Sequence, residues 1–116
     1  MCHVLIIEDE PLVAMLLQGL LEDEGATSFS FADTQDTAIA AALSRRPALI
    51  TSDVKLLSGT GPLAVQAIHE QLGFIPVIFL TGTPADCHPC SPPGKVLCKP
   101  IVQAEFVAVY HEMVRG

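Results

Sequence analysis

The spacing of apolar and polar positions along the chain predicts alternating strands and helices. Apolar or β-branched runs of four to six residues are typical of buried strands. They occur at 4–7, 27–32, 48–53, 76–81 and 95–99. Between them, apolar residues recur at spacings of three and four, as on one face of a helix. These stretches predict helices from Pro11 to a stop signal at Gly25, from a cap at Asp33 or Thr34 to Pro47, from Pro62 to Leu72, and over a stripe from Phe106 to Val114.

Strands that alternate with helices predict a parallel sheet with helices on both faces, because each right-handed crossover packs a helix back onto the sheet. We therefore expect an α/β fold, doubly wound, in which residues 1–116 form a single domain. In such sheets the ligand site lies beyond the carboxyl ends of the strands, where the strand order reverses. Residues that end the predicted strands are thus the first candidates for function.

Polar residues end four of the five predicted strands. The acidic triplet 8–10 follows the first strand, Asp53 ends the third, Thr81 the fourth and Lys99 the fifth. If the fold is right, these four places converge on one crevice. Two carboxylates ~4 Å apart repel by about 4 kcal/mol at the effective dielectric near a protein surface. A cation is therefore expected among them.

The residue types indicate which cation and which reaction. Glu8, Asp9 and Asp53 supply carboxylate oxygens without His or Cys, which suits a hard cation such as Mg²⁺. A carboxylate beside Mg²⁺ can also attack phosphorus and hold an acyl phosphate. Asp53 is the best candidate for this nucleophile because it stands alone at a strand end. Lys99 would offer a positive charge to the phosphoryl oxygens, and the hydroxyl of Thr81 a hydrogen bond.

In these segments the chain resembles the receiver domains of two-component response regulators. The matching pieces, in order, are "IIEDE", "ITSDVKL", the downstream Gly61, "VIFLTGT" and "LCKP". The resemblance implies a flavodoxin-like, five-stranded parallel sheet in the order 2-1-3-4-5. It further implies that Asp53 is the phosphoacceptor, that Thr81 is the switch hydroxyl and that Lys99 pairs with the phosphate, with a cis bond between Lys99 and Pro100.

The resemblance also implies a metal site and a function. The Mg²⁺ ligands would be Glu8, Asp9, Asp53 and the backbone carbonyl of Lys55. A histidine kinase or a histidine phosphotransfer protein would phosphorylate Asp53, and the phosphoryl group would switch the binding of a downstream protein. The chain would be a switch and not an enzyme, because it would catalyse only its own phosphorylation and autodephosphorylation. A homodimer is compatible with the family.

Two other functions stay open at this point. One is a pseudo-receiver that binds partners without phosphorylation, although the intact Asp9, Asp53, Thr81 and Lys99 argue against it. The other is a hydrolase or phosphotransferase with an aspartyl intermediate on a related sheet. In those enzymes the nucleophile typically follows the first strand with another Asp two places on, and "EDEP" does not provide that pair.

The sequence departs from the receiver pattern in two regions. Val96 stands where the family carries an aromatic residue that moves with the switch threonine, so output is expected to use another route. The segment 84–94 holds four prolines, which predicts that the family's fourth helix is degenerate or missing. The same segment contains Cys87-His88-Pro89-Cys90, whose spacing leaves a metal or redox role as an alternative to a plain loop.

Composition narrows the partners. With 13 acidic against 6 basic residues the net charge is -7, which disfavours direct contact with nucleic acid. No stretch of about 20 apolar residues could span a membrane, and the first residues lack the basic start of a secretion signal. We therefore expect a cytoplasmic, stand-alone receiver with reduced cysteines. His3, His69 and His111 are expected at the surface or on a helix face, and the apolar helical stripes in the core.

Overall fold

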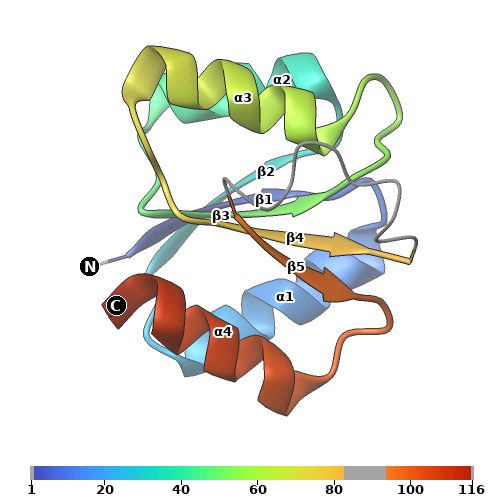
Figure 1. The fold of residues 1–116 in the computed structure, drawn as a ribbon, viewed down its shortest axis with the longest axis vertical. Helices are drawn as coiled ribbons and strands as arrows, with labels where there is room; N and C mark the ends of the chain where they lie inside the picture. The colour runs from blue at the N-terminus through green and yellow to red at the C-terminus, as the bar shows by residue number, and fades with distance from the viewer. Residues whose placement is uncertain (1, 83–93, 116) are drawn as a thin grey trace.

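A computed structural model describes residues 2–82 and 94–115 of the chain. Within these residues, parallel strands form a five-stranded sheet in the order β2-β1-β3-β4-β5 (Figure 1). The strands are β1 His3–Ile7, β2 Ser28–Ala32, β3 Leu49–Asp53, β4 Val77–Thr81 and β5 Lys95–Cys98. The predicted fold class and the strand order 2-1-3-4-5 are confirmed.

Helices cover both faces of this sheet (Figure 1). Helices α2 and α3 lie on one face, and α1 and α4 lie on the other. Their bounds are α1 Pro11–Asp23, α2 Gln35–Ser44, α3 Gly61–Leu72 and α4 Gln103–Arg115. The helices predicted from the apolar spacing are confirmed. The predicted loss of the family's fourth helix, and the Cys87–Cys90 motif, fall outside the described residues.

Local signals explain where the helices begin. Thr34 caps α2, because its side-chain oxygen accepts a hydrogen bond from the Thr37 N–H at 3.1 Å, and the Thr37 hydroxyl in turn binds the Thr34 N–H. Thr60 caps α3 in the same way through the Leu63 N–H at 3.3 Å. Pro11 occupies the first turn of α1, where its missing N–H costs no helical bond. The starts of α1, α2 and α3 are therefore explained by residues next to them in the chain.

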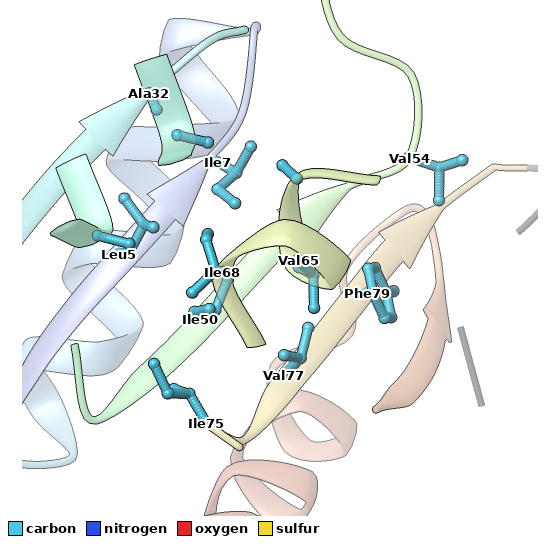
Figure 2. Close-up of a cluster of buried hydrophobic side chains, with 13 residues drawn as sticks. Leu5, Ile7, Ala32, Ile50, Val54, Val65, Ile68, Ile75, Val77 and Phe79 are labelled. Carbon is cyan, nitrogen blue, oxygen red and sulfur yellow. The ribbon is translucent and has the colours of Figure 1, made fainter. Parts of the chain in front are cut away.

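Alternate residues of the strands contribute to two hydrophobic cores, one on each face of the sheet. Figure 2 shows the core under α2 and α3, which includes Leu5 and Ile7 of β1 and Val65 and Ile68 of α3. Val4, Ile6, Leu49, Ile78, Leu80 and Phe106 belong to the opposite core, which α1 and α4 cover. Burial of each such side chain stabilises the fold by about 1.5–3 kcal/mol. The sheet edge that carries the polar strand ends is thus held from both sides.

Two expectations about burial are wrong. The apolar stripe of α1 does not lie wholly in the core: Leu12 is 80% exposed and Leu16 is 49% exposed, while Leu17 and Leu21 face the sheet. A helix laid on one sheet buries a single narrow face, so the outer leucines of a broad stripe stay in solvent. His3 is not at the surface either, because β1 is a central strand and the residue is only 8% exposed.

None of the described helices could cross a bilayer.

Candidate functional site

An acidic cluster occupies the carboxyl edge of the sheet. Glu8, Asp9, Glu10 and Asp53 each offer one carboxylate oxygen, and these oxygens lie within 4.8 Å of one another. They meet because β1 and β3 are adjacent parallel strands, so the chain leaves both strands at the same edge. The sequence prediction assigned Glu8, Asp9 and Asp53 to a metal. The structure adds Glu10, whose position directly after Asp9 was the signal for it.

Lys99 brings a positive charge to this cluster from the end of β5. Its Nζ lies 3.2 Å from Asp53 Oδ2, 3.4 Å from Glu8 Oε1 and 3.9 Å from Glu10 Oε1. The Lys99 N–H donates to the Thr81 carbonyl at 2.9 Å, which ties the lysine to the end of β4. The bond between Lys99 and Pro100 is cis, as predicted. Four carboxylates and one ammonium group leave a formal excess of negative charge.

Burial, together with this excess of negative charge, shifts the pKa values of the site. Glu8 is buried, with 1% of its side chain exposed, and burial together with the negative charge of Asp53 raises its pKa from 4.5 to about 7. Lys99 acts against that rise, as does the hydrogen bond from the Glu10 N–H. Burial tends to lower the pKa of Lys99, but the carboxylates of Glu8 and Asp53 outweigh it and the pKa is raised. The lysine therefore stays charged at neutral pH while the carboxylates compete for positive charge.

The side chain and backbone of Asp53 are both fixed. Its Oδ1 accepts a hydrogen bond from the Val54 N–H at 2.8 Å, and its Oδ2 faces Lys99. The Ser52 hydroxyl donates to the Asp53 carbonyl at 2.8 Å. Gly61 approaches this carbonyl so closely that a Cβ at position 61 would overlap with it. A bulkier residue there would displace the backbone of Asp53, which explains a glycine at the start of α3.

The other two predicted site residues lie at the same edge. Thr81 ends β4, and it is buried, with 3% of its surface exposed. It follows Leu80, the residue of β4 that pairs with Asp53 in the sheet. Lys55 lies two residues after Asp53 in an exposed loop, where its backbone forms an isolated antiparallel bridge with Thr60. All the residues predicted from strand ends are therefore gathered on the strands or the loop that border the acidic cluster.

A groove leads from the solvent to the acidic cluster. It has a volume of about 460 Å³ and its walls include Glu8 and Asp9 together with Met15 of α1, Phe31 of β2 and Asp33. Met15 is 66% exposed and Phe31 is 51% exposed, so the groove is open toward the outer side of α1 and β2. The groove therefore opens the Glu8 and Asp9 side of the acidic cluster to solvent.

The comparison with protein families agrees with this geometry. The model of the response regulator receiver domain matches residues 4–90. The chain belongs to this family. The matched region includes β1, β3 and β4, which carry the acidic cluster, Asp53 and Thr81.

Curated relatives and solved structures lie in the same family. The chain is 42% identical over 85 residues to the phyllosphere-induced regulator PhyR of Methylorubrum extorquens. The aligned region covers 71% of this chain but only 31% of PhyR. The receiver domain of Erythrobacter litoralis PhyR is 30% identical, with a TM-score of 0.88 over 98% of this chain and 90% of that one. The anti-anti-sigma factor PhyR of Bartonella quintana, solved as a double mutant, is 31% identical with a TM-score of 0.85, and the match covers 98% of this chain and 48% of that one. This chain thus spans about a third of the curated relative and about half of the Bartonella protein.

Proposed function

We propose that the chain is a Mg²⁺-dependent phosphoacceptor whose phosphorylation on Asp53 switches the binding of another protein. The observation that carries the proposal is the placement of the Asp53 carboxylate. It lies within 4.8 Å of the other three carboxylates and 3.2 Å from the Lys99 ammonium. A nucleophilic carboxylate, an oxygen-rich cation site and a phosphate-pairing lysine are the parts that phosphoryl transfer to an aspartate requires.

The donor set fits Mg²⁺. Among the residues that the structure describes, the clustered ligands are carboxylate oxygens, without nitrogen or sulfur, which is the chemistry of a hard divalent cation. Burial first, and then the negative charge of Asp53, raise the pKa of Glu8, and a cation bound beside this side chain would favour its carboxylate form. Asp9, Asp53 and Glu8 would hold the ion with the backbone carbonyl of Lys55. When bound, Mg²⁺ would neutralise negative charge on the phosphoryl oxygens.

The side chains of the site have distinct roles in the proposed reaction. A carboxylate oxygen of Asp53 attacks phosphorus, and the bond from phosphorus to the donor nitrogen or oxygen breaks. The hydrogen bond from the Val54 N–H holds the orientation of the nucleophile. Lys99 then leaves its ion pair with the carboxylate to meet the new phosphoryl oxygens, and the Thr81 hydroxyl donates to one of them. The chain turns over no separate substrate, so it is a switch that catalyses only its own phosphorylation and dephosphorylation.

Phosphoryl uptake is the direct test. The protein is incubated with acetyl phosphate or phosphoramidate and Mg²⁺, and intact mass spectrometry is used to look for the mass of one phosphoryl group. The adduct is expected in the wild type and is expected to vanish in Asp53→Asn. Asp23→Asn, which changes an exposed carboxylate at the end of α1, is the matched control and should keep the adduct. A wild type without any adduct would support the pseudo-receiver alternative.

Metal binding gives an independent test. An ion that binds only the folded protein stabilises it by about 1.4 kcal/mol at a concentration ten times its dissociation constant. Thermal unfolding should therefore shift to higher temperature as Mg²⁺ is added, and return on addition of EDTA. Asp9→Asn removes one ligand and should remove most of that shift, while Asp23→Asn should retain it. Equal shifts in both variants would contradict a site at the acidic cluster.

The proposed phosphodonor is a histidine kinase or a histidine phosphotransfer protein, and the downstream partner is a protein. The PhyR relatives suggest that partner's class, because the Bartonella homologue is named an anti-anti-sigma factor. An anti-sigma factor is therefore the first partner to assay, by binding of the purified protein with and without phosphoramidate. Since this chain spans only about a third of the curated PhyR, unchanged binding after phosphorylation would direct the search to other partner classes.

The switch is proposed to work without the family's aromatic residue. Val96 occupies that position in β5, half-buried against the core under α2 and α3 (Figure 2 shows this core). A valine has two short branches and cannot swing between an inner and an outer position as an aromatic ring does. Phosphorylation would therefore reach the partner surface through the backbone of the site's loops. Substitution Val96→Ala should leave the effect of phosphorylation on partner binding intact.

A further inference from the structure

The loop after Asp53 forms a small hairpin that carries Lys55. Two backbone hydrogen bonds close it: the Gly61 N–H donates to the Val54 carbonyl at 2.9 Å, and the Leu56 N–H donates to the Gly59 carbonyl at 3.4 Å. These bonds flank the bridge between Lys55 and Thr60, which is thus a non-hydrogen-bonded antiparallel pair. In such a pair the N–H and C=O groups of both residues point away from each other. The Lys55 carbonyl therefore faces out of the hairpin on one side, and the Thr60 N–H faces out on the other side.

The start of α2 holds the hairpin from the Thr60 side. Gln35 is the main contact: its side-chain Oε1 accepts from the Thr60 N–H at 3.1 Å, and its backbone N–H donates to the Ser58 carbonyl at 2.9 Å. The Leu57 N–H donates to the Asp33 carbonyl at 3.3 Å. Three hydrogen bonds therefore connect the junction between β2 and α2 to the loop that follows the phosphoacceptor.

Packing fixes the same contact. Gly59 has a φ of 79°, and a Cβ placed there would overlap with the side chain of Gln35. The glutamine thus lies directly against the hairpin backbone, and the capped start of α2 sets its position. This arrangement leaves the hairpin little freedom to tilt, because Gln35 contacts it through two hydrogen bonds and through close packing.

We infer that Gln35 is a positioning residue for the metal site. By holding Thr60, it keeps the hairpin in the orientation in which the Lys55 carbonyl can serve as a ligand beside Asp53. The inference rests on the proposed Mg²⁺ site. It adds to that site Gln35, which lies at the junction between β2 and α2. Loss of one hydrogen bond typically changes an equilibrium about three- to tenfold, so removal of the Gln35 oxygen should weaken Mg²⁺ binding by that factor.

The test uses three variants of the whole chain. Gln35→Met keeps the length of the side chain and its packing on Gly59 but removes the acceptor oxygen. Gln35→Glu keeps an acceptor oxygen and serves as the conservative rescue. Gln66→Met makes the same change at an exposed glutamine of α3 and is the matched control. Calorimetric titration with Mg²⁺, well below the unfolding temperature, gives the affinity, and phosphorylation by acetyl phosphate is timed at low and at saturating Mg²⁺.

The expected result separates positioning from general damage. Gln35→Met should bind Mg²⁺ about three- to tenfold more weakly and react slowly at low Mg²⁺, yet reach the wild-type rate at saturation. Gln35→Glu should restore most of the affinity, and Gln66→Met should match the wild type. A variant that merely loosened the fold would lose rate at every Mg²⁺ concentration. Wild-type affinity in Gln35→Met would overturn the inference.

A second measurement distinguishes failure of this inference from failure of the proposed function. Amide exchange of the Thr60 N–H reports the contact itself, and it should quicken in Gln35→Met and stay slow in Gln35→Glu and Gln66→Met. If the wild type binds no Mg²⁺, the proposed function is wrong whatever Thr60 does. If the wild type binds Mg²⁺ and Gln35→Met leaves the Thr60 exchange unchanged, the positioning role alone is wrong. Gly59→Ala, which disturbs the contact from the hairpin side, should weaken Mg²⁺ binding in the same way.

Discussion

Two polar clusters lie at opposite ends of β1, and they differ in how their charges are balanced. At the amino end, His3 places Nδ1 2.9 Å from the Ser28 hydroxyl and Nε2 2.8 Å from the Ser30 hydroxyl. The Arg45 guanidinium donates to the same Ser28 hydroxyl at 3.0 Å. Both ring nitrogens therefore have partners within the protein, and the imidazole can be buried without a counterion.

At the carboxyl end the balance is different. Glu8 and its acidic neighbours share one ammonium group, that of Lys99, among the ion pairs formed by the described residues. The protein thus concentrates like charge at one edge of the sheet, which opposes folding. A polar cluster whose hydrogen bonds are satisfied within the protein supports the structure, whereas a cluster with unbalanced charge marks a place for a ligand. The same strand carries both, about 16 Å apart by the rise of a parallel strand.

Loss of the amino-end cluster should have the largest effect on stability. His3→Ala takes the ring partner from the hydroxyl of Ser30 and from that of Ser28, which keeps Arg45, and it creates a cavity. We therefore expect the free energy of unfolding to fall by about 2–4 kcal/mol. Urea denaturation measures this. Mg²⁺ affinity should stay at the wild-type value, because the site lies at the other end of β1. A large loss of Mg²⁺ affinity in folded His3→Ala would break the separation between the two clusters.

Removal of the cation from the carboxyl-end cluster should cost less, because a proton on Glu8 can replace part of it. Lys99→Met is expected to lower the free energy of unfolding in EDTA by about 1–3 kcal/mol. Lys95→Met is the matched control on the same strand, since Lys95 pairs with Glu112 at 2.7 Å but both side chains are about half exposed. That change should stay within roughly 0.5 kcal/mol. Equal effects of the two substitutions would contradict a buried, strained cluster around Glu8.

The two clusters should respond to pH in opposite directions. Glu8 has a pKa of 4.5 when unfolded and about 7 when folded, so the folded state holds the extra proton and stability falls as pH rises through this range. Burial, and then the charge of Arg45, lower the pKa of His3 below 6.5, so stability falls as pH decreases through 6.5. In the wild type, the two opposite dependences of the free energy of unfolding on pH partly cancel between pH 5 and 7.

Substitution of Glu8 should separate these slopes. In Glu8→Gln, without metal, the Glu8 contribution is absent and that of His3 remains, so the free energy of unfolding should rise between pH 5 and pH 7 relative to the wild type. The difference should be on the order of 1 kcal/mol, measured by urea denaturation in EDTA at each pH. A Glu8→Gln profile parallel to that of the wild type would show that Glu8 titrates normally.

The smallest effect concerns a polar group that lies in neither cluster. Thr51, in the middle of β3, is fully buried, and its hydroxyl has no hydrogen-bond partner among the residues that the structure describes. Thr51→Val replaces it by an apolar group of the same shape and should stabilise the protein by about 0.5–1.5 kcal/mol. Thermal unfolding measures the change. A destabilised Thr51→Val would mean that this hydroxyl is partnered after all, and that the sheet holds a third polar cluster.

Much of the fold and part of the site could be predicted from the sequence. The β-branched and apolar runs and the caps placed the strands and helices, because these signals act between residues close in the chain. Strand-end position alone selected Asp53 and Lys99, and the structure places their side chains 3.2 Å apart. The burial of His3 could not be predicted, because it depends on the two serines that β2 places beside it.

The sequence by itself determined the alternation of strands and helices, the residue types that gather at the carboxyl edge, and the resemblance to receiver domains. Only the tertiary structure decided which carboxylates surround Lys99, and that the start of α2 contacts the hairpin after Asp53. The physical reason is distance along the chain. The preference of a segment for helix or strand depends on residues that are neighbours in the chain. Burial and electrostatic interaction depend on side chains that only the folded sheet brings together, such as Glu8 and Lys99.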